Sequence, residues 1–220
     1  MNITSQDLRE MALKMASNVE NILEKSLKQN TTKKEIFAIE HEINKAHTSI
    51  DDNVFKYIAL KRPAAIDLRI ALAVMKINSQ LERIGDQAVN IKRNISKITK
   101  PFSEINSISE EVRVMLKNGI DAFVNSDSKL AADVIHQDIE VNDLYKEIMT
   151  SFIIKMKRDT VDFDDGFYII RIAKCLERIG DLTTNIAEDI IFLESGTDIR
   201  HNPDVKFNRR KDDKKEGSNE

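Results

Sequence analysis

The sequence has few of the residues that break helices or build disulfides. Its 220 residues include six glycines, three prolines, no tryptophan and a single cysteine, Cys175. Few glycines and prolines leave little material for turns, which favours long helices joined by short connections. One cysteine excludes an internal disulfide and is typical of a reducing compartment. We therefore predict an all-α protein that is located in the cytoplasm.

The chain also lacks a strong charge bias and long apolar runs. Its net charge is −3 although 32% of its residues are charged, so the composition gives no reason to expect nucleic-acid binding. The N-terminal stretch MNITSQDLRE has no apolar signal-peptide core, and no run is long enough for a membrane span. Any contact with a membrane is therefore predicted to be indirect.

Capping residues and prolines divide the chain into six expected helices. The capping-box patterns at Thr32–Glu35 and Ser107–Glu110 are predicted to open the second and fourth helices. Pro63 is predicted to lie in the first turn of the third helix, which Pro101 is predicted to end.

The other three helices are predicted to begin at polar caps, and the last one ends at a glycine. The expected caps are Thr4 or Ser5, Ser126 or Asp127, and Asp162 or Asp164. Gly196 is predicted to end the sixth helix as a left-handed cap. Residues 201–220 are polar and of mixed charge, and they are predicted to form a disordered tail.

The phrase LERIGD occurs twice, at Leu81–Asp86 and at Leu176–Asp181. Around each copy, apolar or small residues recur at helical spacing, at 81, 84, 88, 91, 95 and 98 and at 176, 179, 183, 186, 190 and 193. Such a stripe is typical of a helix that packs in a bundle. We predict two tandem three-helix bundles, residues 1–100 and 101–200, which pack together because each alone would be marginally stable.

Each LERIGD phrase breaks two rules of helix stability. Glu82 and Asp86 are like charges four residues apart, which repel by roughly 0.2–0.5 kcal/mol. Gly85 costs about 0.5–1 kcal/mol relative to alanine inside a helix. The second phrase repeats the pattern at Glu177 and Asp181, and in each copy the acids share one helix face beside the apolar stripe. Positions that break local rules together are where a functional site is expected.

Oxygen-bearing partners occur on the preceding helix of each half. In each half an acid and an asparagine, four residues apart, lie about 20 residues before the expected hairpin turn. The LERIGD acids lie about as far after that turn, so an antiparallel hairpin brings both pairs to one level. The candidate metal ligands are Glu40, Asn44, Glu82 and Asp86 in the first half, and Asp138, Asn142, Glu177 and Asp181 in the second.

Converging carboxylates are costly unless a positive charge neutralises them. No lysine or arginine shares these helical-wheel positions, which predicts a divalent or trivalent metal ion, bound singly or in a multinuclear cluster. Oxygen ligands favour iron, manganese, magnesium or calcium over zinc. A structural explanation stays open, because Arg83 with Asp86 and Arg178 with Asp181 are spaced for surface ion pairs, and a glycine also suits a tight helix crossing.

Two segments resemble the signatures of the PhoU family of phosphate-transport accessory and regulatory proteins. The segment RPAAIDLRIALAVMKINSQLERIGDQAVNI, residues 62–91, resembles the first signature. The segment LERIGDLTTNIAEDIIFLESGTDIRH, residues 176–201, resembles the second. The resemblance extends from about residue 4 to residue 201.

The resemblance implies two tandem three-helix bundles, often dimeric, whose E/D-x-x-x-D pairs bind metal clusters, of iron for example. The LERIGD acids match this motif in full, whereas the Glu40 and Asp138 pairs end in Asn44 and Asn142 instead of aspartate. This departure puts full occupancy of a cluster in doubt.

The resemblance also implies a non-catalytic role in the cytoplasm. Members of the family negatively regulate phosphate uptake and the phosphate-starvation response, and they link the ATPase subunit of a phosphate ABC transporter to a sensor histidine kinase. Two alternatives are a ferritin-like metal-oxo enzyme and a metal-free helical scaffold. The enzyme normally requires four helices around one centre and histidine ligands, and the four histidines here fit no Glu-x-x-His motif.

Overall fold

The computed structural model describes residues 3–100 and 102–195, all of whose regular elements are helices. The predicted all-α architecture of six helices is thereby confirmed. The helices are α1 (Ser5–Leu27), α2 (Lys33–Lys61), α3 (Ala65–Ile95), α4 (Asn106–Asn125), α5 (Ser128–Lys157) and α6 (Phe163–Ser195). The predicted left-handed cap at Gly196, the tail at 201–220 and Pro101 lie outside the described residues.

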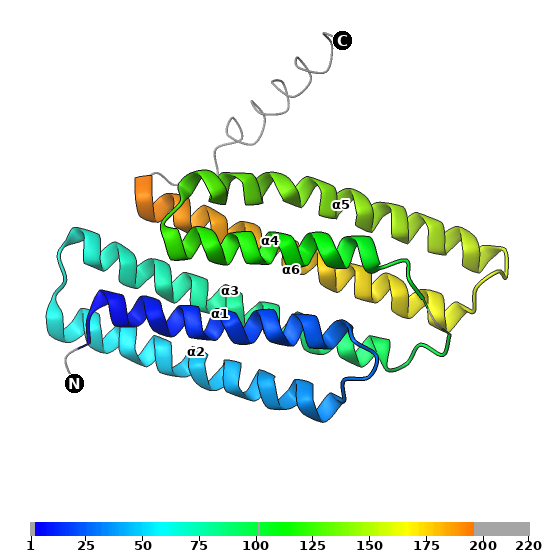
Figure 1. Ribbon diagram of the computed structural model, residues 1–220, viewed down its shortest axis with the longest axis horizontal. Coiled ribbons are helices and arrows are strands. Elements are labelled where there is room, and N and C mark those ends of the chain that lie inside the picture. The colour runs from blue at the N-terminus through cyan, green and yellow to red at the C-terminus, as the bar shows by residue number, and fades with distance from the viewer. Residues whose placement is uncertain (1–2, 101, 196–220) are drawn as a thin grey trace, which may run out of the picture.

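The six helices lie side by side along the long axis of the molecule (Figure 1). Helices α1, α2 and α3 form one bundle, and α4, α5 and α6 form the other. The bundles join mainly through α3 and α6, with a smaller contact between α1 and α4. Among the described helices, α2 and α5 contact only helices of their own bundle.

The core is built from the apolar stripes that flank the two LERIGD phrases. Leu81, Ile84, Ala88, Ile91 and Ile95 of α3 are buried, and Ile98 packs beside them. The stripe of α6 is buried along its whole length, through Leu176, Ile179, Thr183, Ile186, Ile190 and Leu193. Both stripes therefore face the core as the sequence predicts, and α3 and α6 form the centre of the molecule.

Side-chain caps fix several helix starts where the sequence predicts them. Thr4 and Asp7 form a capping box on α1, and Thr32 and Glu35 form one on α2. Asp127 accepts hydrogen bonds from the first backbone amides of α5. These contacts are local, so short sequence patterns are sufficient to predict them.

Three predicted boundaries are wrong. Helix α4 begins at Asn106 after Ile105, without a side-chain cap, so Ser107 and Glu110 form no capping box there. Burial of Ile105 in the core draws the chain into helix before Ser107 is reached. Helix α3 starts at Ala65, so Pro63 precedes the helix, and it ends at Ile95, well before Pro101.

Candidate metal centre

The two LERIGD glycines lie at tight contacts between neighbouring helices. A Cβ atom on Gly85 would lie 3.3 Å from Ile43 Cδ1 of α2. A Cβ atom on Gly180 would lie 3.1 Å from Asp138 Oδ1 and 3.3 Å from Val141 Cγ1 of α5. Close helix crossing thus explains both glycines, and in the second half it also brings a candidate ligand of α5 against the LERIGD phrase of α6.

In the first half, the acids of α2 and α3 lie close enough to influence one another. Burial raises the pKa of Asp86, and the charge of Glu40 raises it further. Burial likewise raises the pKa of Glu82, followed by the charge of Asp86. Asn44 Nδ2 donates a hydrogen bond to Glu40 Oε1 at 3.0 Å. The hairpin therefore assembles a group of acids whose negative charge is costly to keep.

In the second half, a lysine neutralises one of the candidate ligands. Lys174 Nζ lies 2.6 Å from both carboxylate oxygens of the buried Glu177, three residues later in α6. Asn142 Nδ2 donates a hydrogen bond to Asp138 Oδ2 at 2.7 Å. The prediction that no lysine or arginine shares the helical-wheel positions of these acids is therefore wrong for Lys174. Lys174 precedes Glu177 by three residues, so the two side chains are neighbours on one face of the helix.

The two LERIGD phrases also lie close to each other across the bundle interface, which their sequence pattern does not predict. A hollow of about 440 Å³ lies between α3 and α6 and is lined by Arg83, Asp86, Gln87, Arg178, Asp181, Leu182 and Asn185. The last acid of each phrase thus faces a space that both bundles share. The two phrases occupy equivalent positions in the two repeats, and this feature of the sequence could have indicated that they lie close together. It does so only if α3 is already known to pack against α6.

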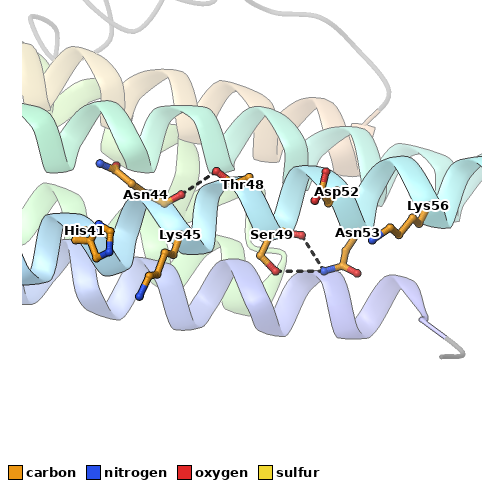
Figure 2. Close-up of a pocket in the computed structure, with 8 residues that line it drawn as sticks. All are labelled: His41, Asn44, Lys45, Thr48, Ser49, Asp52, Asn53 and Lys56. Carbon is orange, nitrogen blue, oxygen red and sulfur yellow. Dashed lines mark hydrogen bonds between the residues drawn. The ribbon is translucent and has the colours of Figure 1, made fainter.

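A second polar hollow follows the outer face of α2 (Figure 2). Its volume is about 540 Å³, and its lining residues are His41, Asn44, Lys45, Thr48, Ser49, Asp52, Asn53 and Lys56. Hydrogen bonds within the helix occupy part of this face, since Thr48 Oγ1 donates to the Asn44 carbonyl oxygen at 3.1 Å. Every lining residue belongs to α2, so this is an open helix face, and Asn44 is the candidate ligand on it.

In residues 3–100 and 102–195, no three side chains of histidine, cysteine, aspartate and glutamate lie together as a metal site requires. The fold brings together parts of each predicted set of ligands. In the first half, Glu40 lies close enough for its charge to affect the pKa values of Glu82 and Asp86. In the second half, Asp138 packs against Gly180. Asn44 and Asn142 turn their amide groups toward the acids of their own helices.

The family model of the PhoU domain matches two segments of this chain, residues 7–95 and 105–190, one in each bundle. The chain belongs to the PhoU family. This finding confirms the resemblance of the LERIGD segments and the two-repeat architecture. The PhoU family is a non-enzymatic family of accessory proteins, so the prediction of a non-enzyme is confirmed.

Individual PhoU relatives agree along most of the chain. A phosphate-specific transport system accessory protein PhoU homolog from Pseudomonas putida is 32% identical over 74% of this chain and 66% of its own length, just under two thirds. A homolog of the same name from Clostridium acetobutylicum is 30% identical over 88% of this chain and 94% of its own length. The crystal structure of PhoU from Pseudomonas aeruginosa is 29% identical, covers 87% of this chain and 97% of its own, and superposes with a TM-score of 0.82.

None of the described helices is long and apolar enough to cross a membrane. This agrees with the absence of long apolar runs in the sequence.

Proposed function

We propose that this protein is a cytoplasmic negative regulator of phosphate uptake and of phosphate-starvation signalling. The match of the PhoU domain to both bundles carries this proposal, because it covers the elements that build the molecule. The relatives from P. putida and C. acetobutylicum are named as accessory proteins of a phosphate-specific transport system. The same role in this chain requires contacts with other proteins and no chemical step.

The partners that we propose are the ATPase subunit of a phosphate ABC transporter and a phosphate sensor histidine kinase. The active form is a homodimer that binds no nucleic acid. The test is affinity capture of the tagged full chain from cells grown with abundant and with scarce phosphate. Recovery of the ATPase subunit and the kinase, in amounts that change with phosphate supply, is expected. Recovery of neither under both conditions contradicts the proposed role.

We further propose that the acidic motifs hold metal ions, and that the first half holds its ion more tightly. The raised pKa values of Glu82 and Asp86 support this, because they mark carboxylates whose charge lacks full compensation. A cation would supply that compensation, with Glu40 and Asn44 of α2 as further ligands after modest side-chain rotation. Their oxygen atoms suit iron, manganese, magnesium or calcium.

The second half would bind its ion less tightly, through Asp138, Asn142, Glu177 and Asp181. Lys174 already neutralises Glu177 and must be displaced before that carboxylate ligates a cation. A metal at either site would fix the relative position of two helices in one bundle. In the regulator, this would present a defined surface to a partner.

Elemental analysis of protein purified without chelator tests the metal proposal. Asp86→Asn is expected to remove more metal than Asp181→Asn, and the double variant is expected to remove nearly all of it. Asp143→Asn is the matched control, because Asp143 is an exposed acid that pairs with Lys146 outside both motifs. Metal retained unchanged in the double variant would contradict the proposed sites. Absence of metal from the parent protein, before and after incubation with iron or manganese, would favour the metal-free scaffold.

A further inference from the structure

The turn between α2 and α3 exposes large apolar side chains at one end of the molecule. The exposed fraction is 79% for Leu60, the penultimate residue of α2, and 66% for Ile66 in the first turn of α3. This turn lies at the opposite end of the long axis from the turn between α5 and α6 (Figure 1). Exposed apolar groups with a polar rim mark contact sites. We propose that this α2–α3 tip, residues 55–70, binds the surface of an anionic phospholipid bilayer.

The charge of the α2–α3 tip fits this ligand. The tip carries one acid, Asp67, against four basic residues, which gives a net charge of +3; the basic residues are Lys56, Lys61, Arg62 and Arg69. Lys56, Lys61 and Arg62 are exposed beside Leu60. Asp67 is directed toward α1, where its Oδ1 accepts a hydrogen bond from Ser5 Oγ at 2.7 Å. Apolar residues that enter the lipid boundary, combined with basic residues that meet the headgroups, are the two requirements for surface binding.

The second bundle provides an internal comparison. The LERIGD phrases are 95 residues apart, so residues 150–165 correspond to the α2–α3 tip. This α5–α6 tip also exposes an aromatic residue, Phe163, with an exposed fraction of 69%. However, it contains three basic residues and four acids, which gives a net charge of −1; the acids are Asp159, Asp162, Asp164 and Asp165. The two tips share exposed apolar groups and differ in charge, so only the first suits an anionic surface.

The backbone of the turn holds the apolar side chains in place. Arg62 adopts the left-handed conformation, with φ of 48°, and its N–H donates to the Ile58 carbonyl oxygen at 3.2 Å. Pro63 follows and restricts its own φ. The turn from α2 to α3 therefore presents Leu60 and Ile66 on a short, constrained connection. The proposed contact is with the membrane surface, and it goes beyond the prediction that any membrane contact is indirect.

A bilayer suits the α2–α3 tip better than a second copy of the chain. Two copies that joined through the same tip would oppose two surfaces of net charge +3, and like charges destabilise such a contact. An anionic bilayer instead offers many negative charges in one plane. Each basic residue near such a surface contributes about a fivefold gain in affinity.

The test is cosedimentation of the purified full chain with lipid vesicles. Binding is expected to vesicles of phosphatidylcholine mixed with phosphatidylglycerol, to weaken with added salt, and to be absent with phosphatidylcholine alone. Lys56→Gln with Arg62→Gln is expected to weaken binding about twenty-five-fold. Leu60→Ser with Ile66→Ser is expected to weaken it at least about tenfold. All four side chains are exposed, so the variants are expected to stay folded, which circular dichroism would verify.

The matched control is Phe163→Ser in the α5–α6 tip, which is expected to leave vesicle binding unchanged. Equal losses in this control and in the α2–α3 variants would overturn the proposal, as would absence of binding to anionic vesicles. Sedimentation velocity tests a further outcome. If the protein binds no vesicles and the α2–α3 variants dissociate a dimer, the proposal is overturned and the tip is assigned to self-association. The proposal does not depend on the phosphate role, since vesicle binding and partner capture can fail independently.

Discussion

Arg9 of α1 donates a hydrogen bond to Ser126 Oγ, just beyond the end of α4, at 2.7 Å. The same guanidinium donates to the carbonyl oxygens of Phe123 and Val124, and its Cζ lies 5.1 Å from the centroid of the Phe123 ring. The last carbonyl groups of a helix lack partners within it, so Arg9 satisfies acceptors that would otherwise need water. One side chain thus joins the first bundle to the second.

Replacement of Arg9 by alanine is expected to lower the free energy of unfolding by about 1–3 kcal/mol, because it removes several hydrogen bonds and a ring contact. Urea denaturation of the purified protein measures this change. Arg113→Ala is the control, since Arg113 pairs with Glu110 on an exposed face of α4 and should contribute at most about 0.5 kcal/mol. If Arg9→Ala lowers the free energy of unfolding no more than the control does, the contact of Arg9 with α4 does not stabilise the link between the bundles.

The two LERIGD glycines are expected to respond differently to substitution by alanine. In Gly180→Ala the new Cβ approaches Asp138 Oδ1 at 3.1 Å and Val141 Cγ1 at 3.3 Å, whereas in Gly85→Ala it approaches the flexible end of Ile43 at 3.3 Å. Alanine also gains about 1 kcal/mol of helix propensity. Gly85→Ala is therefore expected to be nearly neutral, and Gly180→Ala to lose about 1–2 kcal/mol.

Thermal and urea unfolding of both glycine variants checks this expectation. The two variants serve as controls for each other, because the chemical change and the helical context are the same. Greater destabilisation by Gly85→Ala than by Gly180→Ala would contradict the packing described for α5 and α6.

Asp86 is expected to reduce the stability of the metal-free protein at neutral pH. Burial raises its folded pKa above the ordinary value of 3.8, so the folded protein holds this proton more tightly than the unfolded chain. Its contribution to stability therefore falls as pH rises from about 4 through the raised pKa. Asp86→Asn should raise the free energy of unfolding by about 0.5 kcal/mol at neutral pH, a small amount because solvent screens the charge of the partly exposed Asp86 side chain.

Urea denaturation across the acidic range, in the presence of a chelator, measures the effect of Asp86→Asn. The gain should disappear below about pH 4, where the carboxyl group is protonated in both states. The exposed acid of Asp143→Asn should show no such gain. If Asp86→Asn is instead less stable than the parent protein at neutral pH in the presence of chelator, the prediction is wrong. Asp86 would then make a stabilising contact that is worth more than the repulsion between the acids.

Asp165 is expected to anchor the connection between the bundles in a pH-dependent way. Its carboxylate accepts hydrogen bonds from Thr99 N at 2.8 Å and from Thr99 Oγ1 at 2.9 Å. The backbone hydrogen bond from Thr99 lowers the pKa of Asp165 below its usual value of 3.8. The stabilisation is therefore present above about pH 4 and is lost as pH falls through the lowered pKa.

Asp165→Ala is expected to cost about 1–3 kcal/mol at neutral pH, because it leaves the Thr99 amide without this acceptor. Hydrogen exchange at residue 99, followed by mass spectrometry, should increase in the variant and in the parent protein at low pH. Thr99→Val removes only the hydroxyl contact and should show a smaller effect. Unchanged exchange in Asp165→Ala would contradict the anchoring role.

Local patterns in the sequence predict much of the fold. The capping box of Thr32 with Glu35 and the buried stripe of α6 depend on neighbours within one helix, and both were predicted. The start of α4 was not predicted, because burial of Ile105 outweighs the capping pattern at Ser107. Tertiary burial is worth more than one cap and cannot be read from a short pattern.

The proximity of Glu40 to the LERIGD acids was predictable from the sequence, whereas the arrangement of the two halves was not. The spacing of Glu82 and Asp86 indicates a shared helix face, and hairpin geometry indicates proximity to Glu40, whose charge does affect Asp86. The pairing of Lys174 with Glu177 has the spacing i, i+3 and was available in the sequence. The hollow lined by Arg83 and Arg178 forms because particular faces of α3 and α6 pack together. No short sequence pattern indicates which faces of the two helices make that contact.

The peripheral positions of α2 and α5 bear on communication between the two halves. Since each contacts only its own bundle, a displacement of α2 changes nothing that α5 touches directly. Any cooperativity between the halves must therefore pass through the central helices or the smaller contact of α1 with α4. The shared hollow provides an electrostatic route, because Asp86 and Asp181 both line it and a charge gained or lost at one alters the potential at the other. Binding in one half would then tune affinity in the other without any rearrangement of the outer helices.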